Sequence, residues 1–378
     1  MEKTENYEKV FKNGIYSKVM KDGFWGLINS KGEIICPLKY EILYDFENGF
    51  AKICNGGLWG FINFNGKEIC PPKYHEVWVF KNNFSKVRFL DKWGFINNFG
   101  EEICPPKYDE VSGFKKNFAK VRIGTKWGFI TSQGKEVGPI KYDEVWYYEG
   151  NFAKVRLGSK WGFVNLDGEP ICPIKYDETS NFIKGYSKVR VGNKWGYINE
   201  LGQEVFEPQF DETWLIDKNF VKVRVQDKWF VINLEKCAIV SAEYDEILQL
   251  KQNFAKVKSG SKWGFINSEG IEICSPQYEE LWSFMNGYAK AKMNGKWGFV
   301  DTNGNQITPF IYDAVWKFEY GFAAVQLDGK WGFIDTSGKA LCPCIYDVVW
   351  SFQDNYALVQ FCKQKTYIDS LGREVANY

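Results

Sequence analysis

The chain of 378 residues contains a single histidine, His75, and so lacks the side chain on which most acid–base and metal chemistry at neutral pH depends. An excess of one charge is also missing, because 48 Lys and Arg face 47 Asp and Glu. General binders of nucleic acids or membrane surfaces need a basic excess. No run approaches the roughly 18 apolar residues of a membrane span, and the polar N-terminal segment is not typical of a signal peptide. We therefore expect a cytoplasmic protein with no nucleic-acid or membrane partner.

Motifs for catalysis and cofactor binding are missing as well. The sequence has no P-loop, no nucleophile elbow, no zincin motif and no Rossmann glycine pattern. None of its ten cysteines forms a C-x-x-C pair, and six of them share one periodic position, which indicates buried thiols. Tyr-Asp-Glu segments such as 142–144 recur along the chain, and a catalytic carboxylate pair would occur only once. We expect no catalytic residue, no cofactor and no metal.

Aromatic residues, in contrast, make up 18% of the chain and follow a fixed period. Ten tryptophans lie 34 residues apart without insertion or deletion, and an eleventh unit carries Lys365 at this place. Such a period is the signature of a repeat architecture. We predict one array over residues 1–378, with an irregular unit at about 220–245 and a capping unit at about 354–378. The ten are Trp25, Trp59, Trp93, Trp127, Trp161, Trp195, Trp229, Trp263, Trp297 and Trp331.

Most units contain Lys-Trp-Gly, an aromatic residue, an aliphatic residue and Asn or Asp, as at 92–97 and 330–335. In this motif the sequence resembles the WG, or KWG, repeat family. The resemblance covers essentially every residue from about Tyr7 onward. It implies no catalytic residues, since the family is defined by its repeat. The unit at about 220–245 departs from the pattern, with Phe230 and Lys236 in place of glycines.

Turn chemistry divides each unit into four short strands. Two-residue turns such as Asn294-Gly295 precede the tryptophan, and Asn-x-x-Gly turns such as 267–270 follow its strand. The next strand, Glu68–Cys70, should end at Pro71, because proline cannot donate to a ladder. The strand after it is expected at 73–78. No segment has a 3.6-residue apolar period, so we predict no helix.

The predicted fold class is all-β, with eleven tandem 34-residue antiparallel β-meanders stacked as an open solenoid or superhelix. A closed propeller-like ring is the alternative, although eleven blades exceed the usual number of roughly 4–8. Folding each hairpin about its turn places Lys154 opposite Phe163 and Arg156 opposite Trp161. The preceding strand should place Glu144 opposite Lys154. Most units carry an acid and a lysine at this pair, whereas Ala314/Ala324 and Val348/Leu358 are apolar on both sides. Only Ile42 with Lys52 departs from this joint change of the two positions.

The most informative position lies 19 residues after each repeat tryptophan, where large and small residues alternate through the middle of the array. One interpretation is interdigitation, in which each Trp covers the small residue of the adjacent unit. The other is a row of exposed indoles that forms a binding surface. The position reads Tyr44, Trp78, Ser112, Trp146, Ser180, Trp214, Leu248, Trp282, Trp316 and Trp350, and its six tryptophans are the candidate binding residues.

Two functions of different classes fit these features. The first is a non-catalytic scaffold that binds another protein through an extended repeat surface. The second is binding of a carbohydrate or cell-wall ligand through the spaced aromatic residues, by analogy with choline-binding modules. Binding of single-stranded nucleic acid is a weaker third possibility, since nearby acids pair with the basic residues. It would use Arg88, Arg122, Arg156, Arg190 and Arg224.

Overall fold

The computed structural model describes residues 7–13, 16–217 and 219–375, and over these residues it contains β-strands and turns but no helix. The strands form eleven small antiparallel sheets of three or four strands each. This confirms the all-β fold class of tandem antiparallel meanders. No helix in the part of the chain that the structure describes is long and apolar enough to cross a membrane.

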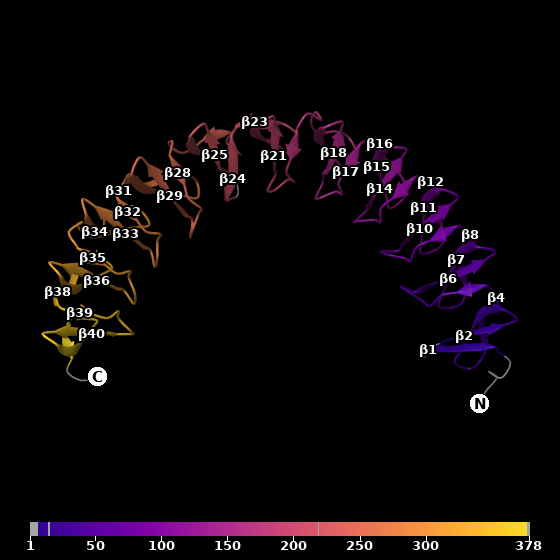
Figure 1. Cartoon of the computed structure of the whole chain (residues 1–378), viewed down its shortest axis with the longest axis horizontal. Helices are drawn as coiled ribbons and strands as arrows, with labels where there is room; N and C mark the ends of the chain where they lie inside the picture. Colours follow the sequence, from indigo (N-terminus) through magenta and orange to yellow (C-terminus); the bar gives the residue numbers. More distant parts are fainter. Residues whose placement is uncertain (1–6, 14–15, 218, 376–378) are drawn as a thin grey trace. The chain divides into compact units, whose positions relative to one another are not determined.

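Two compact units make up the chain. Unit 1 comprises residues 1–182 and 200–203, and unit 2 comprises residues 183–199 and 204–378. Within unit 1 the sheets follow one another in the order of the sequence, from indigo β1 to magenta β18 (Figure 1). The single array over residues 1–378 stays a prediction, and residues 376–378 of the expected capping unit lie outside the described residues.

The strands of unit 1 are β1 (Lys9–Asn13), β2 (Tyr16–Lys21), β3 (Phe24–Asn29), β4 (Ile34–Tyr40), β5 (Ile42–Leu43), β6 (Phe50–Asn55), β7 (Leu58–Asn63), β8 (Glu68–Tyr74), β9 (Glu76–Val77), β10 (Phe84–Phe89), β11 (Lys92–Asn97), β12 (Glu102–Tyr108), β13 (Glu110–Val111), β14 (Phe118–Ile123), β15 (Lys126–Thr131), β16 (Glu136–Tyr142), β17 (Glu144–Val145), β18 (Ala153–Leu157), β19 (Lys160–Val164) and β20 (Glu178–Thr179).

The strands of unit 2 are β21 (Tyr186–Val191), β22 (Lys194–Asn199), β23 (Glu204–Phe210), β24 (Glu212–Asp217), β25 (Phe220–Val225), β26 (Lys228–Asn233), β27 (Ala238–Ile239), β28 (Glu246–Ile247), β29 (Phe254–Ser259), β30 (Lys262–Asn267), β31 (Glu272–Tyr278), β32 (Glu280–Leu281), β33 (Tyr288–Met293), β34 (Lys296–Asp301), β35 (Ala314–Val315), β36 (Phe322–Leu327), β37 (Lys330–Asp335), β38 (Ala340–Tyr346), β39 (Val348–Val349), β40 (Tyr356–Phe361), β41 (Gln364–Asp369) and β42 (Glu374–Val375).

The central hairpin of each repeat has the predicted register. In β18–β19, Lys154 lies opposite Phe163 and Arg156 opposite Trp161. The connecting turns take the positive φ angles that two-residue hairpin turns require, for example 61° at Gly158. Local turn chemistry therefore determines this part of the repeat.

The pairing predicted for the strand before the hairpin is wrong by two residues. Glu144 lies opposite Arg156 and not opposite Lys154. The cause is the position of the turn. Glu149 pairs with Phe152, so the connection is centred later than expected. Each residue of β17 therefore pairs with a residue of β18 that lies closer to the C-terminus than expected. In this register Ile42 is no longer an exception, because it lies opposite Cys54 and not opposite Lys52.

The charges of the two residues that lie face to face change together from repeat to repeat. An acid at the first position meets Arg or Lys, as Glu110 meets Arg122 and Glu280 meets Lys292. Where the acid is absent, so is the cation. Ala314 lies opposite Gln326, and Val348 lies opposite Gln360.

The prolines do not end the third strand of the repeat. β8 runs from Glu68 through Pro71 and Pro72 to Tyr74, and only two residues of the strand expected at 73–78 form a separate strand, β9. β8 is the outer edge of its sheet, and its pairing with β7 shifts register on both sides of Phe61. At an edge with a bulge, a proline need not donate to a ladder, which explains why the strand continues.

The outer strand crosses directly over the glycine that follows the repeat tryptophan. A Cβ atom on Gly94 would lie 2.5 Å from the Cys104 carbonyl oxygen and 2.7 Å from the Pro106 nitrogen. Only a residue without Cβ permits this approach. At 220–245 the corresponding residue is Phe230, and the outer strand of that sheet is reduced to β27, two residues long.

Successive repeats share their cores. In one cluster Phe61 and Tyr74 of one repeat pack with Val87 and Ile96 of the next. Polar contacts follow the same direction: the Tyr74 hydroxyl donates to a Glu102 carboxylate oxygen at 2.7 Å. The six cysteines at the periodic position are buried free thiols, namely Cys36, Cys70, Cys104, Cys172, Cys274 and Cys342.

Candidate binding site

One face of the hairpin carries the repeat tryptophan together with a lysine and an arginine. In the repeat at β17–β19, the Arg156 guanidinium lies 5.7 Å from the centre of the Trp161 ring and 2.9 Å from the Glu144 carboxylate. The arginine is thus held between an acid and an indole, and Lys154 is left without the acid that the sequence had assigned to it. The candidate residues described below lie on or next to this face.

The six predicted binding tryptophans are all partly exposed. Interdigitation between adjacent repeats would have buried them, so it does not account for this position. Their role in binding a ligand stays a prediction. The exposed fractions are 47% for Trp78, 47% for Trp146, 61% for Trp214, 53% for Trp282, 39% for Trp316 and 39% for Trp350.

Exposed as they are, several of these indoles are held in place by polar contacts. The Lys154 ammonium lies 3.9 Å from the centre of a Trp146 ring, and Trp146 Nε1 donates to a Glu144 carboxylate oxygen at 3.1 Å. The edge of Trp146 also meets Trp161, with ring centres 6.2 Å apart. Cation–π contacts of this kind are worth about 0.5–1 kcal/mol at exposed sites. The same arrangement recurs at Trp78, which Lys86 approaches to 3.7 Å.

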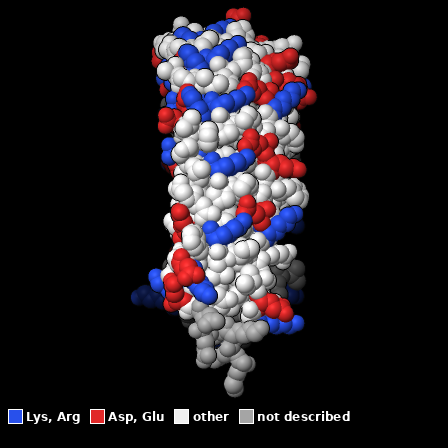
Figure 2. Space-filling view, turned by 90° about the vertical axis from the view of Figure 1, so that its right-hand side faces the viewer, with Lys and Arg blue, Asp and Glu red and all other residues white. Residues whose placement is uncertain are grey.

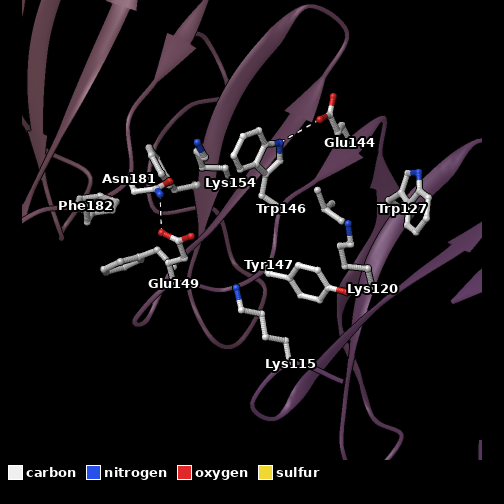
Figure 3. A pocket seen from close by; sticks show the side chains of 13 residues that line it. Lys115, Lys120, Trp127, Glu144, Trp146, Tyr147, Glu149, Lys154, Asn181 and Phe182 are labelled. Atoms are coloured by element: carbon white, nitrogen blue, oxygen red, sulfur yellow. Dashed lines mark hydrogen bonds between the residues drawn. The ribbon is translucent and has the colours of Figure 1, made fainter. Parts of the chain in front are cut away.

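The repeat that carries Ser112 at the alternating position contributes to a pocket. Ser112 replaces a tryptophan in the repeat of β13–β16, and its hydroxyl accepts a hydrogen bond from the Lys120 backbone N–H at 2.8 Å. The space beside Trp127 is bounded on the other side by Trp146 of the next repeat. This pocket measures about 410 Å³ (Figure 3). It is lined by Lys115, Lys120, Trp127, Glu144, Val145, Trp146, Tyr147, Glu149, Phe152, Lys154, Phe163, Asn181 and Phe182.

Tyr147 distinguishes this pocket from the equivalent places in other repeats. Its hydroxyl donates to the Gly113 carbonyl oxygen at 3.4 Å, which ties it to the preceding repeat. The ammonium groups of Lys120 and Lys115 lie 4.7 Å and 5.4 Å from the centre of its ring. Figure 3 shows the two lysines on either side of the ring.

The charges in the pocket are unequally satisfied. Both carboxylates have partners, since Glu144 binds Arg156 and Glu149 accepts a hydrogen bond from Asn181 Nδ2 at 2.5 Å. The ammonium groups of Lys115, Lys120 and Lys154 form no ion pair with any described residue. Burial lowers the pKa of Lys154, because it disfavours the charged form. The pocket therefore offers cations beside aromatic rings.

Unit 2 contains a smaller version of the same pocket, of about 290 Å³. Lys251 and Lys256 occupy the places of Lys115 and Lys120 four repeats further along, and Leu248 stands where Ser112 is. Burial and the neighbouring Lys251 lower the pKa of Lys256, whose ammonium donates to the Leu281 carbonyl oxygen at 3.1 Å. Leu248 lines this version of the pocket, and Ser283 takes the place of Tyr147.

Many other charges of the repeats are paired. Lys73 binds Glu102 at 2.9 Å, and Lys126 binds Asp143 at 2.6 Å. The face of the molecule in Figure 2 accordingly shows basic and acidic side chains side by side in recurring rows. The ring-bound lysine is an exception that recurs along the chain, since Lys86 lies over Trp78 and Lys290 over Trp282 as Lys154 lies over Trp146.

Sequence reasoning identified Trp146 but not Ser112, Tyr147, Lys115 or Lys120 as parts of one site. A signal was present: Tyr147 is aromatic where other repeats have Val79, Gly113 or Ser283. Its meaning depends on the contact between two successive repeats, which the sequence does not display.

A family model described as a WG containing repeat matches ten consecutive stretches of the chain, from residue 25 to residue 361. The chain belongs to the WG-repeat family. The matched stretches of this WG-repeat protein are 25–59, 59–93, 93–127, 127–161, 161–195, 195–229, 231–263, 263–297, 297–331 and 331–361. None of the curated proteins compared with it matches.

Solved structures similar to the WG-repeat chain share little sequence with it. A eukaryotic initiation factor is 11% identical, with a TM-score of 0.29, over 78% of this chain and 94% of the other. The extracellular domain of a putative hybrid two-component system from B. thetaiotaomicron is 9% identical, with a TM-score of 0.24, over 89% and 58%. PorZ from Porphyromonas gingivalis is 10% identical, with a TM-score of 0.23, over 99% and 69%. Similarities of this size do not indicate a function for this chain.

Proposed function

We propose that this WG-repeat protein is a non-catalytic scaffold that binds another protein through the tryptophan–lysine face of its repeats. The observation that carries the proposal is the row of partly exposed tryptophans, of which Trp78 and Trp146 are held in place by a lysine and a glutamate. Tryptophan is enriched among the residues that dominate protein–protein binding energy. A side chain that is already ordered loses little conformational entropy when a partner binds.

The repetition supports an extended partner. Equivalent tryptophans recur along each unit, Trp78 and Trp146 in the first and Trp214 to Trp350 in the second. Repeat proteins commonly bind through such continuous surfaces. All ten cysteines are free thiols, which supports action in a reducing compartment such as the cytoplasm.

Selection from a displayed library of random 12-residue peptides would test the proposal. We expect peptides that bind the full chain and lose at least about tenfold in affinity, ~1.4 kcal/mol, with Trp146→Ala or Trp282→Ala. Phe99→Ala is the matched control, because Phe99 is 74% exposed and does not line the pocket. Selected peptides that bind all three variants as tightly as the unmodified protein would contradict the proposal.

Carbohydrate binding is the second candidate function. It is favoured by the pocket between Trp127 and Trp146, since aromatic walls can also accept the apolar faces of sugar rings. A panel of soluble oligosaccharides separates the two candidates. Binding of an oligosaccharide that depends on Trp146, with no peptide selected, would favour this second function over the first.

A further inference from the structure

We propose that the pocket between Trp127 and Trp146 binds an acidic, extended peptide of the partner protein, with an aromatic side chain on Trp127 and nearby carboxylates at Lys115 and Lys120. This inference rests on the proposed function and specifies the chemistry of the partner. It concerns unit 1 alone, in which all these residues lie.

The charge of the site selects a carboxylate. Lys115 and Lys120 both approach Tyr147, and neither forms an ion pair within the described residues. The two glutamates of the pocket already have Arg156 and Asn181 as partners. The carboxylates of an acidic peptide would therefore meet an unsatisfied ammonium group on either side of Tyr147, beside low-dielectric aromatic walls, where charge-assisted hydrogen bonds are strongest.

The chain itself shows what can cover the indole. In the repeat where Tyr44 takes the place of Ser112, its ring stacks on Trp59, with ring centres 5.6 Å apart and planes 19° apart. Trp59 is the equivalent of Trp127 two repeats earlier. Ser112 is too small to cover Trp127, so an aromatic side chain from the partner can occupy the same position.

The pocket is formed by two successive repeats. Lys115 and Lys120 belong to the repeat that also supplies Trp127, and Tyr147 and Trp146 belong to the next repeat. Adjacent side chains of an extended chain point to opposite faces, whereas side chains two residues apart point to the same face at a separation of about 7 Å. A carboxylate and a ring separated by one residue therefore suffice to reach both repeats.

Fluorescence anisotropy with a fluorescein-labelled hexapeptide in which single Ser residues separate alternating Glu and Phe, so that both point to one face, tests the site directly. We expect this probe to bind the full chain about tenfold more tightly than the matching Gln–Phe hexapeptide. Lys115→Gln combined with Lys120→Gln should remove that preference. The matched control is Lys31→Gln combined with Lys135→Gln, which removes the same charge at two exposed lysines of unit 1 and should change affinity less than about twofold.

A second variant covers the Trp127 ring, as Tyr44 covers Trp59, and keeps all the lysines of the pocket. Ser112→Tyr introduces the residue that the chain already has at position 44, and it should lower affinity for the Glu–Phe probe by about tenfold without lowering the melting temperature. Equal binding of the Glu–Phe and Gln–Phe probes would overturn the inference, as would an unchanged affinity in Ser112→Tyr. The proposed function would survive either result if library peptides still depended on Trp146. A soluble acidic oligosaccharide that displaces the probe from the pocket and binds more tightly would also overturn the peptide assignment.

Discussion

Glu144 and Arg156 form an ion pair of 2.9 Å across β17 and β18, and this pair leaves Lys154 to lie over Trp146 at 3.9 Å. The acid binds one cation and also accepts a hydrogen bond from the indole N–H of Trp146. One carboxylate thereby orders both the structural arginine and the exposed tryptophan. The repeat face has this arrangement because Glu144 binds Arg156 and Trp146, and Lys154 lies over the indole.

A double-mutant cycle distinguishes the observed pairing from the one expected from sequence. Glu144→Gln with Arg156→Gln should give a coupling energy of about 0.2–1 kcal/mol, since the pair is partly exposed and screened by solvent. The cycle of Glu144→Gln with Lys154→Gln should give a smaller coupling. The free energy of unfolding in urea measures both, and a larger coupling for Lys154 would contradict the register.

Trp146 should contribute little to stability compared with a ring on the covered side of the same repeat. We expect Trp146→Ala to change the free energy of unfolding by less than about 1 kcal/mol. Phe163→Ala should cost about 3–5 kcal/mol, because Phe163 is 1% exposed and packs against Phe182. Urea denaturation of both variants measures the difference. A large loss in Trp146→Ala with unchanged peptide binding would show that the indole serves packing.

The glycine after the repeat tryptophan should be irreplaceable where the outer strand crosses it. Gly94→Ala places a Cβ within 2.5 Å of a carbonyl oxygen, so we expect a loss of about 1–3 kcal/mol from forced backbone shifts. Gly113→Ala is the control, since its Cβ would meet nothing within 4 Å and its φ is not in the left-handed region. Comparable melting temperatures of the two variants would refute the crossing-strand explanation.

Two equivalent tyrosines should respond oppositely to loss of the hydroxyl. Tyr74→Phe removes a 2.7 Å hydrogen bond to Glu102 and should cost about 1 kcal/mol. The buried hydroxyl of Tyr142 has no hydrogen-bond partner among the described residues, because Pro170 stands where the glutamate would be. Tyr142→Phe should therefore leave stability unchanged or raise it. Thermal unfolding of the two variants in one buffer provides the comparison.

Low pH should destabilise the repeats, because it protonates the glutamates of the outer strands. The hydrogen bond from Lys73 lowers the pKa of Glu102 below its ordinary value of 4.5. A carboxyl with a lowered folded-state pKa stabilises the fold above the unfolded-state pKa and loses this contribution as the pH falls through the folded-state pKa. The melting temperature should thus fall below about pH 4.5, and less steeply in Glu102→Gln. Glu269→Gln, at an exposed turn, should keep the slope of the unmodified protein.

The sequence alone determined the repeat, its period and the central hairpin. These features depend on residues close in the chain: Asn294-Gly295 forms its turn with φ angles of 52° and 76° whatever lies nearby. The candidate tryptophans could also be predicted, since the alternation at Trp78, Ser112 and Trp146 is visible in the sequence.

Only the tertiary structure decided which strand continues through its prolines, which acid meets which cation and where a pocket opens. Pro71 is tolerated because β8 lies at the edge of its sheet, and Glu144 meets Arg156 because the connecting turn is centred later than the expected pairing requires, which moves the partner of Glu144 by two residues. The pocket requires Trp146 of one repeat to face Trp127 of the one before it. Such relations arise from packing between residues distant in the chain, and a local sequence pattern contains no information on the position of a neighbouring repeat.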